Sequence, residues 1–313
     1  MRKQDFENKD KSEVEGSKQA KIEVCQDCPR HCRINNPQFV GFCGKDSSHV
    51  RIAKVMRHMW EEPVIVGETG SGAIFFSHCS LKCKFCQNYE ISHLGRGKDF
   101  DVMGLAKLIK KVDESGAENI NFVTPTHYTS KIVEALKIYK PKVPIVWNTS
   151  GYECNLQRIE GIVDIFLFDF KYFDSNLSAK FSSARDYFDV CMRALKTARE
   201  IVKEDIIENG VMKKGIIIRH LVLPNCAEDS TRIFEEIKKE LGTNVIISLM
   251  SQFVPCYKAK DDPSLNRQVT PLEYKKVLMA IKKLGFERGY VQESSSAKCD
   301  YTPDFSKEKF FEL

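Results

Sequence analysis

The 313-residue sequence has no hydrophobic run long enough to cross a membrane. Its longest strongly apolar stretch, residues 163–170, is interrupted by Asp164 and Asp169, and it is far shorter than the ~20 residues of a membrane-spanning helix. The N-terminal residues, Met-Arg-Lys-Gln-Asp-Phe-Glu, lack the apolar core of a signal peptide. We therefore expect a cytoplasmic protein with no membrane partner.

The sequence also lacks a strong charge of either sign. Its 48 basic and 43 acidic residues leave a net charge of only +5. Paired lysines are scattered at helix-like spacing and do not form the basic stripe of a nucleic-acid-binding module. We expect no nucleic-acid partner, and the content of 42% hydrophobic and 29% charged residues is ordinary for a globular chain.

Cysteine is the residue type that is unusually abundant, with 12 copies. A disulfide framework is not expected in a chain without a secretory signal. Seven cysteines form two clusters, namely Cys25, Cys28, Cys32 and Cys43, and then Cys79, Cys83 and Cys86. Clustered cysteines in the cytosol indicate metal binding. We interpret the isolated ones as small buried hydrophobic residues: Cys154, Cys191, Cys226, Cys256 and Cys299.

From residue 72 onward, short apolar runs alternate with segments of helical periodicity. The expected strands cover residues 73–77, 120–123, 145–148, 163–168, 216–221 and 245–249. Helices are expected around 101–116, 132–136, 187–201, 231–241 and from Thr270 onward. This alternation predicts an α/β fold with a parallel sheet. Six strands are too few for a closed eight-unit barrel, and an open doubly wound sheet is an alternative. In either arrangement, chemistry is expected at the carboxyl ends of the strands.

The second cysteine cluster directly follows the first of these strands. Cys79-Ser-Leu-Lys-Cys83-Lys-Phe85-Cys86 supplies three closely spaced thiolates, which can hold three irons of a 4Fe–4S cluster and leave the fourth iron without a protein ligand. The alternative is structural zinc, but closed zinc sites need four ligands, and no fourth partner is near in sequence. We therefore favour an iron–sulfur cluster.

This motif resembles that of the radical S-adenosylmethionine (SAM) enzymes, and its extension through Asn88 is similar to pyruvate formate-lyase-activating enzymes. The N-terminal cysteines resemble those of uncharacterised relatives of these enzymes. The resemblance covers roughly residues 70–290 and implies a partial (β/α)6 barrel. It also implies that a reduced 4Fe–4S cluster cleaves SAM to methionine and a 5′-deoxyadenosyl radical, which abstracts hydrogen from a substrate. The implied partners are a reductant such as flavodoxin or ferredoxin, and a glycyl-radical enzyme or another protein substrate.

Several residues near the expected strand ends are candidates for cofactor binding. Where the family commonly has Gly-Gly-Glu, this chain has a turn with Thr124 and Thr126; where the family has an Asp-Thr-Asn-Gly turn, it has Asn148. With the family motif in view, the candidate cofactor-binding residues are Phe85, Asn88, Thr124, Thr126, Asn148, Asp169, Lys171 and Arg219. For the two turns, the alternative is an ordinary loop after a strand.

Asp169 and Lys171 are the candidate catalytic residues. They are two positions apart, so they point to one face of an extended chain. The pair matches the Asp-x-Lys of the activating enzymes, where it helps position the cofactor and the substrate backbone. Arg219 could clamp a carboxylate through two hydrogen bonds. The alternatives are a structural ion pair for Asp169 and Lys171 and a buried salt bridge for Arg219.

The first cysteine cluster could hold a second metal group. Cys25, Cys28, Cys32 and Cys43 supply four thiolates, enough for an auxiliary 4Fe–4S cluster or for zinc. The spacings favour the cluster narrowly, and both alternatives stay open. The expected organisation is a disordered polar tail over 1–24, a Cys-rich metal-binding segment over 25–68, the core barrel over 69–290 and a C-terminal tail over 291–313.

The function we expect is that of an iron–sulfur enzyme that cleaves SAM reductively, most simply to activate a glycyl-radical enzyme. The alternatives are radical modification of another peptide or of a small molecule, and a non-catalytic iron–sulfur electron carrier. Candidate residues after several strands favour an enzyme, because an electron carrier does not need them.

Overall fold

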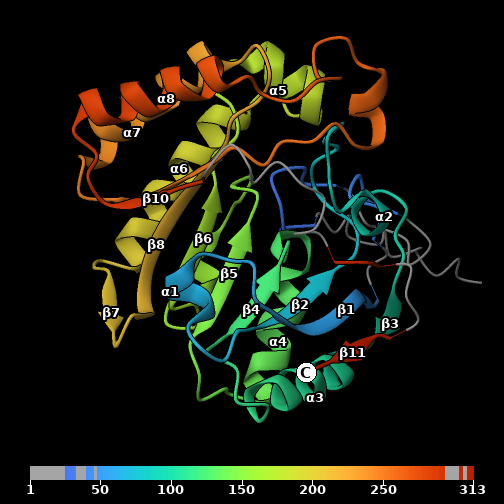
Figure 1. The fold of residues 1–313 in the computed structure, drawn as a ribbon. Helices are drawn as coiled ribbons and strands as arrows, with labels where there is room; N and C mark the ends of the chain where they lie inside the picture. The colour runs from blue at the N-terminus through green and yellow to red at the C-terminus, as the bar shows by residue number, and fades with distance from the viewer. Residues whose placement is uncertain (1–24, 33–39, 46–47, 293–302, 306–308) are drawn as a thin grey trace, which may run out of the picture.

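The computed structural model describes residues 25–32, 40–45, 48–292, 303–305 and 309–313 (Figure 1). The tail expected over 1–24, residues 293–302 of the expected C-terminal tail, and Cys299 lie outside these ranges. The described residues form one large sheet with the strand order β10-β9-β8-β6-β5-β4-β2-β1-β11. Among the described helices, none combines the length and the hydrophobicity that a membrane-spanning segment needs.

Six parallel strands form the centre of the sheet, and they match the six expected from the sequence. They are β2 (Ser71–Phe76), β4 (Ile120–Val123), β5 (Ile145–Thr149), β6 (Ile165–Asp169), β8 (Val211–Leu221) and β9 (Ile246–Met250). All of them carry long buried runs because helices or inner segments cover both faces. Within the described ranges, the two ends of the sheet do not pair with each other. The predicted α/β fold with a partial (β/α)6 barrel is confirmed.

The sequence did not predict the outer strands. β10 (Gly289–Val291) adds parallel to β9, and β1 (Val50–His58) pairs antiparallel with β2. β11 (Phe311–Glu312) and β3 (Lys98–Phe100) both pair with β1, and β7 (Ile206–Glu208) pairs with β8. The domain boundary at residue 68 remains a prediction, although β1, which precedes it, belongs to the same sheet as β2.

Helices cover the outer face of the sheet (Figure 1). The long ones are α3 (Val102–Asp113), α4 (Thr129–Ile138), α5 (Ser175–Ser182), α6 (Tyr187–Ile201), α7 (Ala227–Leu241) and α8 (Pro271–Leu284). Helix α8 begins where the sequence predicts, because Thr270 and Glu273 form a reciprocal capping box. Short helices are α1 (Pro63–Val66), α2 (Tyr89–Ser92) and the 3-10 turns η1 (Thr126–Tyr128), η2 (Leu156–Ile159) and η3 (Tyr257–Asp261).

The inner face of the sheet divides into an apolar floor and a polar upper part. Ile65 of α1 packs on Val146, Leu167 and Ile217, which point inward from the central strands. One step further toward the strand ends, the inward residues are polar. Asp169 on β6 lies opposite Arg219 on β8, which lies opposite Ser248 on β9. Because side chains alternate along each strand, polar residues line the inner face above the apolar cluster around Ile65.

Candidate active site

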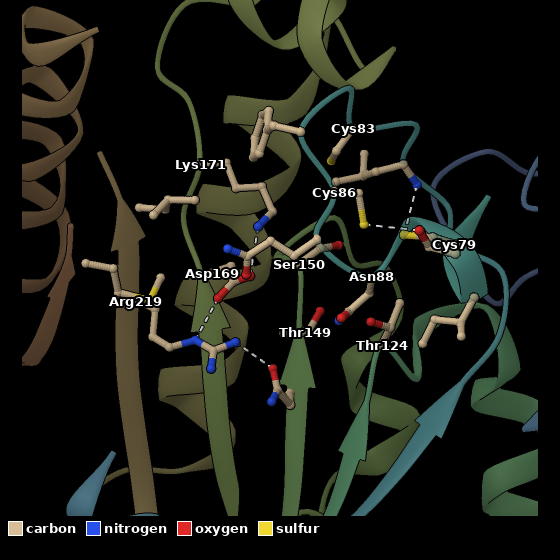
Figure 2. Close-up of a pocket in the computed structure, with 18 of the residues that line it drawn as sticks. Cys79, Cys83, Cys86, Asn88, Thr124, Thr149, Ser150, Asp169, Lys171 and Arg219 are labelled. Carbon is tan, nitrogen blue, oxygen red and sulfur yellow. Dashed lines mark hydrogen bonds and ion pairs between the residues drawn. The ribbon is translucent and has the colours of Figure 1, made fainter. Parts of the chain in front are cut away.

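A cavity of about 220 Å³ lies where the central strands end. The cysteine triplet borders it, and Figure 2 shows the three thiols across the cavity from Asp169, Lys171 and Arg219. Seven of the eight predicted cofactor-binding residues line it: Phe85, Asn88, Thr124, Asn148, Asp169, Lys171 and Arg219. The parallel strands explain this convergence, because their carboxyl ends meet at one edge of the sheet.

The triplet is suited to an iron–sulfur cluster because each sulfur has a polar group beside it. The Leu81 backbone N–H donates to Cys79 Sγ at 3.4 Å, and the Ser182 hydroxyl donates to Cys83 Sγ at 3.0 Å. Cys86 Sγ lies 3.1 Å from Ser92 Oγ. Hydrogen bonds to the sulfurs stabilise their charged form and tune the cluster that they hold.

Burial raises the pKa of Cys79 to about 11 and that of Cys86 to about 12. Without a metal, these thiols stay protonated at neutral pH, and binding of iron therefore releases protons. No three His, Cys, Asp or Glu side chains in the described ranges are arranged to hold a single metal ion.

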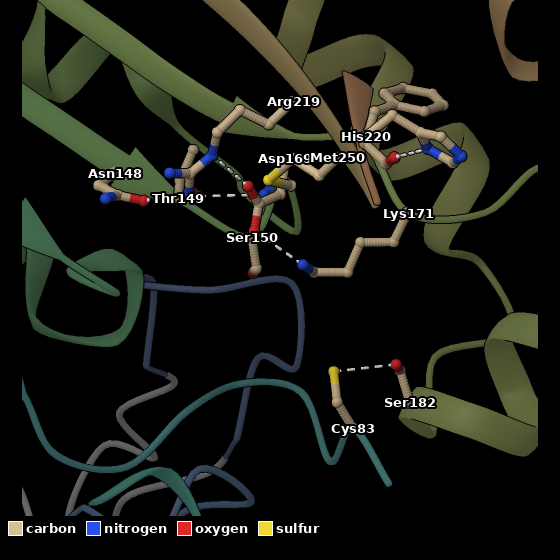
Figure 3. A network of polar contacts seen from close by, with 12 residues as sticks. Cys83, Asn148, Thr149, Ser150, Asp169, Lys171, Ser182, Arg219, His220 and Met250 are labelled. Carbon is tan, nitrogen blue, oxygen red and sulfur yellow. Dashed lines mark hydrogen bonds and ion pairs between the residues drawn. The ribbon is translucent and has the colours of Figure 1, made fainter. Parts of the chain in front are cut away.

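Asp169 joins two cations at the cavity wall (Figure 3). Lys171 Nζ lies 2.8 Å from Asp169 Oδ2, and Arg219 Nε lies 2.7 Å from Oδ1. Burial alone would raise the pKa of Asp169, but the charges of Arg219 and Lys171 hold it below its usual value. The carboxylate therefore stays ionised and fixes both cations beside the cavity.

Arg219 has a further set of partners that the sequence did not reveal. Its Nη1 lies 2.8 Å from Glu61 Oε2, and its Nη2 donates to Asn148 Oδ1 at 2.6 Å. Asn148 Nδ2 and Asn121 Nδ2 donate in turn to Glu61 Oε1 at 2.8 and 3.1 Å. Glu61 is thus a site residue that precedes the motif range. Glu62 and Pro63 follow it directly. Nothing in this local sequence indicates that the segment carries α1 into the barrel.

The two threonines after β4 have different roles. Thr124 lines the cavity and has a φ of 59°, in the left-handed region that β-branched residues rarely adopt. Such backbone strain is concentrated at functional sites. Thr126 does not line the cavity, because it is buried and its hydroxyl donates to Glu153 Oε1 at 2.5 Å.

The N-terminal cysteines lie against the loop that carries the triplet. Arg30 Nε donates to the Ser80 carbonyl at 3.0 Å, and Lys82 Nζ donates to the Cys43 carbonyl at 3.3 Å. The Phe42 backbone N–H donates to Cys32 Sγ at 3.3 Å. Burial raises the pKa of both Cys28 and Cys43. These contacts bring the two cysteine clusters to neighbouring positions in the fold.

The isolated cysteines are not all alike. Cys191 and Cys226 are buried, as expected, whereas Cys154 and Cys256 are partly exposed. Cys154 Sγ lies 3.6 Å from the Gln26 carbonyl, and burial, followed by the nearby charges of Glu153 and Asp27, raises the pKa of its thiol. It therefore belongs near the N-terminal cysteines, which its distance in sequence hides. Cys256 Sγ lies 3.2 Å from the Phe85 carbonyl, beside the triplet.

Comparison with known protein families gives a match to one of them. A sequence profile of the radical SAM superfamily matches residues 73–221, which include the triplet and strands β2 to β8. An uncharacterised protein of Methanocaldococcus jannaschii is 32% identical over 314 residues, covering 93% of this chain and 87% of that protein.

Solved structures with similar folds are more distant. SuiB of Streptococcus suis, bound to SAM, has a TM-score of 0.45 and 14% identity over 69% of this chain and 48% of its own. Native anSMEcpe with bound SAM has a TM-score of 0.45 and 16% identity, covering 74% of this chain and 62% of that one. The chain thus spans about half the length of SuiB.

The match over residues 73–221 coincides with the strands that surround the cavity, and the cysteine triplet falls inside it. Members of this superfamily bind a 4Fe–4S cluster and SAM, and the residues around the cavity suit these cofactors. The chain belongs to the radical SAM superfamily.

Proposed function

We propose that this chain cleaves SAM reductively in the cavity beside Cys79, Cys83 and Cys86 and uses the product radical to abstract hydrogen from a substrate. The observation that supports this most is the convergence of three thiols and the Asp169–Lys171–Arg219 network on one cavity. When bound, the cofactors would supply an electron and a 5′-deoxyadenosyl radical that takes a hydrogen atom from the substrate.

The residues of the chain would bind and orient the reactants. The three cysteines would hold three irons, and Ser182, Ser92 and the Leu81 N–H support their sulfurs. Lys171 and Arg219, each fixed by Asp169, give the cavity directed hydrogen-bond donors for polar groups of SAM. A flavodoxin or ferredoxin is the expected source of the electron.

Electron paramagnetic resonance tests the binding step. A variant with Ala at Cys25, Cys28, Cys32 and Cys43 would isolate the triplet cluster. We expect its reduced spectrum to change when SAM is added, because an iron without a protein ligand is free to bind it. A spectrum that stays the same while SAM binds would contradict an open iron at the triplet.

We also propose that Cys25, Cys28, Cys32 and Cys43 hold an auxiliary 4Fe–4S cluster and not zinc. One observation supports this. The segment contacts the triplet loop at Ser80 and Lys82, where a second redox centre could exchange electrons with the first.

Activation of a glycyl-radical enzyme stays a prediction of the family resemblance. A second candidate, modification of a small molecule, is favoured by a further polar cavity that adjoins the first inside the barrel. A mass-spectrometric search for deuterium in 5′-deoxyadenosine, with deuterated candidate substrates, separates the two. Deuterium transfer from a glycine of a partner protein would support activation.

A further inference from the structure

A second cavity of about 280 Å³ lies inside the barrel, next to the one beside the triplet. The two cavities share wall residues, which are Gln87, Asn88, Thr124, Asn148, Asp169, Arg219, Met250 and Gln252. Figure 3 shows Asn148, Asp169, Arg219 and Met250 along this shared wall. A molecule in the second cavity would therefore face the groups expected to hold SAM.

The remaining wall of this cavity comes from the end of β1 and the segment after it, from the inner side of β9, and from the strand β10. It includes His58, Trp60, Glu61, Glu62, Ser248 and Tyr290. Its volume is near the lower end of the roughly 300–1,000 Å³ of typical small-molecule pockets. We therefore consider a small substrate, and not a large polymer segment.

Glu62 is the residue that defines the chemistry of this cavity. Its side chain is buried, with the residue only 8% exposed, and its Oε2 has no hydrogen-bond partner among the described residues. The Ser248 hydroxyl hydrogen-bonds to the same carboxyl group. Burying a carboxyl oxygen without a hydrogen-bond partner costs free energy. We therefore expect a ligand group to bind to this oxygen.

The cations around the cavity are already engaged by other carboxylates. Arg219 pairs with Asp169 and with Glu61, and Lys171 pairs with Asp169. Two cations thus face three carboxyl groups within this part of the described chain, and burial raises the pKa of Glu62, which favours its neutral form unless a cation binds beside it. His58 adds no charge, because burial lowers its pKa. The described residues of the cavity wall therefore supply no further cation that would hold Glu62 in its ionised form.

His58 supplies a second unsatisfied group. Its Nδ1 is buried and has no hydrogen-bond partner among the described residues, and the residue is 6% exposed. In the neutral ring, Nδ1 either donates or accepts one hydrogen bond, according to the tautomer. The cavity therefore offers a carboxyl oxygen for a cation and a ring nitrogen for a polar group of the same ligand.

We propose that this second cavity binds the substrate, a small organic cation whose ammonium or guanidinium group pairs with Glu62. The proposal rests on the proposed radical function and names the class of its substrate. A cation held at Glu62 would place the rest of the molecule toward the shared wall at Asp169 and Met250, where the hydrogen atom would be abstracted.

Ligand-observed NMR with the SAM-loaded, cluster-containing protein tests this. n-Butylamine is the cationic probe, and 1-butanol and butyrate are its neutral and anionic counterparts. We expect binding of the amine alone, and a loss of about tenfold or more in its affinity in Glu62→Gln. Glu160→Gln, at an exposed carboxyl group outside the cavity, should bind the amine like the wild type.

Equal binding of amine and alcohol, binding of butyrate, no binding of the amine, or an unchanged affinity in a folded Glu62→Gln variant would overturn the proposal. The blocked peptide acetyl-Gly-Lys-Gly-amide carries the same ammonium group on a peptide, and tighter binding of this peptide than of butylamine would overturn the small-molecule assignment. 5′-Deoxyadenosine is measured on the same samples. Its formation without selective amine binding would leave the radical function standing and reject this inference alone.

Discussion

Asp169 is the residue on which the geometry of the proposed cofactor site depends. It fixes Lys171 and Arg219 at 2.8 and 2.7 Å. Asp169→Asn keeps the shape but removes the charge that orients both cations. We expect the affinity for SAM to fall by about tenfold or more, since hydrogen bonds to charged groups contribute roughly 1.5–3 kcal/mol. Equilibrium binding of SAM to the cluster-containing variant measures this.

The iron content and the fold should survive this substitution, because Arg219 keeps Glu61 as a partner. Asp189→Asn on the exposed face of α6 serves as the matched control and should bind SAM normally. An unfolded Asp169→Asn variant, or a folded one with unchanged affinity, would mean that the ion pair is structural.

The buried carboxyl group of Glu153 is expected to make the stability of the fold depend on pH. It is buried below the loop after β5, and its Oε1 accepts from Trp147 Nε1 at 3.0 Å and from the hydroxyls of Thr126 and Thr149. Burial raises its pKa from 4.5 to about 7. The folded state therefore binds one more proton than the unfolded state between these values, and stability falls as the pH rises through them.

Glu153→Gln should remove this pH dependence, because Gln keeps the acceptor at Oε1 and carries no charge. Between about pH 6 and about pH 8, the wild type should lose roughly 1.4 kcal/mol more of its free energy of unfolding than the variant does. Urea unfolding at both pH values measures the difference. Parallel curves for the two proteins would show that Glu153 does not titrate in this range.

At the scale of elements, Asp27 connects the N-terminal cysteine segment to the barrel. Its carboxylate lies 2.7 Å from Lys45 Nζ and 3.1 Å from Arg158 Nη1, and it accepts from the Ser130 backbone N–H at 3.0 Å. Asp27→Asn would leave the buried Lys45 without a counter-charge, and removing one partner of such a pair costs about 3–5 kcal/mol.

Hydrogen exchange can locate this loss. Residues 25–32 and 40–45 should exchange faster in Asp27→Asn, while the central strands β4, β5 and β6 should keep their protection. Faster exchange throughout the barrel would show that the segment is part of the core and not a separately docked element.

The central strands and most helices could be predicted because their signals are local. Strand β4 has the predicted bounds 120–123, where three of the four residues are apolar and all four are buried, and α6 runs over the predicted residues 187–201. Strands β1 and β11 could not be predicted in the same way. Their pairing joins residues such as Val55 and Phe311, and nothing within either segment indicates the other.

In the candidate site too, residues with a local sequence signal were predicted, and residues that only the fold brings together were not. Residues in family motifs at the ends of the strands were predicted, and seven of them line the cavity beside the triplet. Glu61 and Glu62 were not predicted, because they reach the site through the path of α1 inside the barrel. Cys154 was missed for a similar reason: only the fold brings it to Gln26.

At the scale of the whole molecule, the two cysteine clusters predict the iron content. Reconstituted protein should contain about eight irons per chain and little zinc, as two four-iron clusters require. Replacing Cys25, Cys28, Cys32 and Cys43 with Ala should halve the iron. About four irons with one zinc in the wild type would contradict the auxiliary cluster, and loss of all iron in the variant would show that the two sites depend on each other.

The central claim concerns cleavage of SAM at Cys79, Cys83 and Cys86, and product analysis tests it most directly. Reconstituted, dithionite-reduced protein is incubated with SAM without oxygen, and 5′-deoxyadenosine is quantified by liquid chromatography and mass spectrometry. We predict that the wild type and Cys226→Ala, a buried cysteine outside the cavity, form the product and that Cys83→Ala does not. Product formation by Cys83→Ala at the wild-type rate, or none by a wild type with its full iron content, would contradict the account.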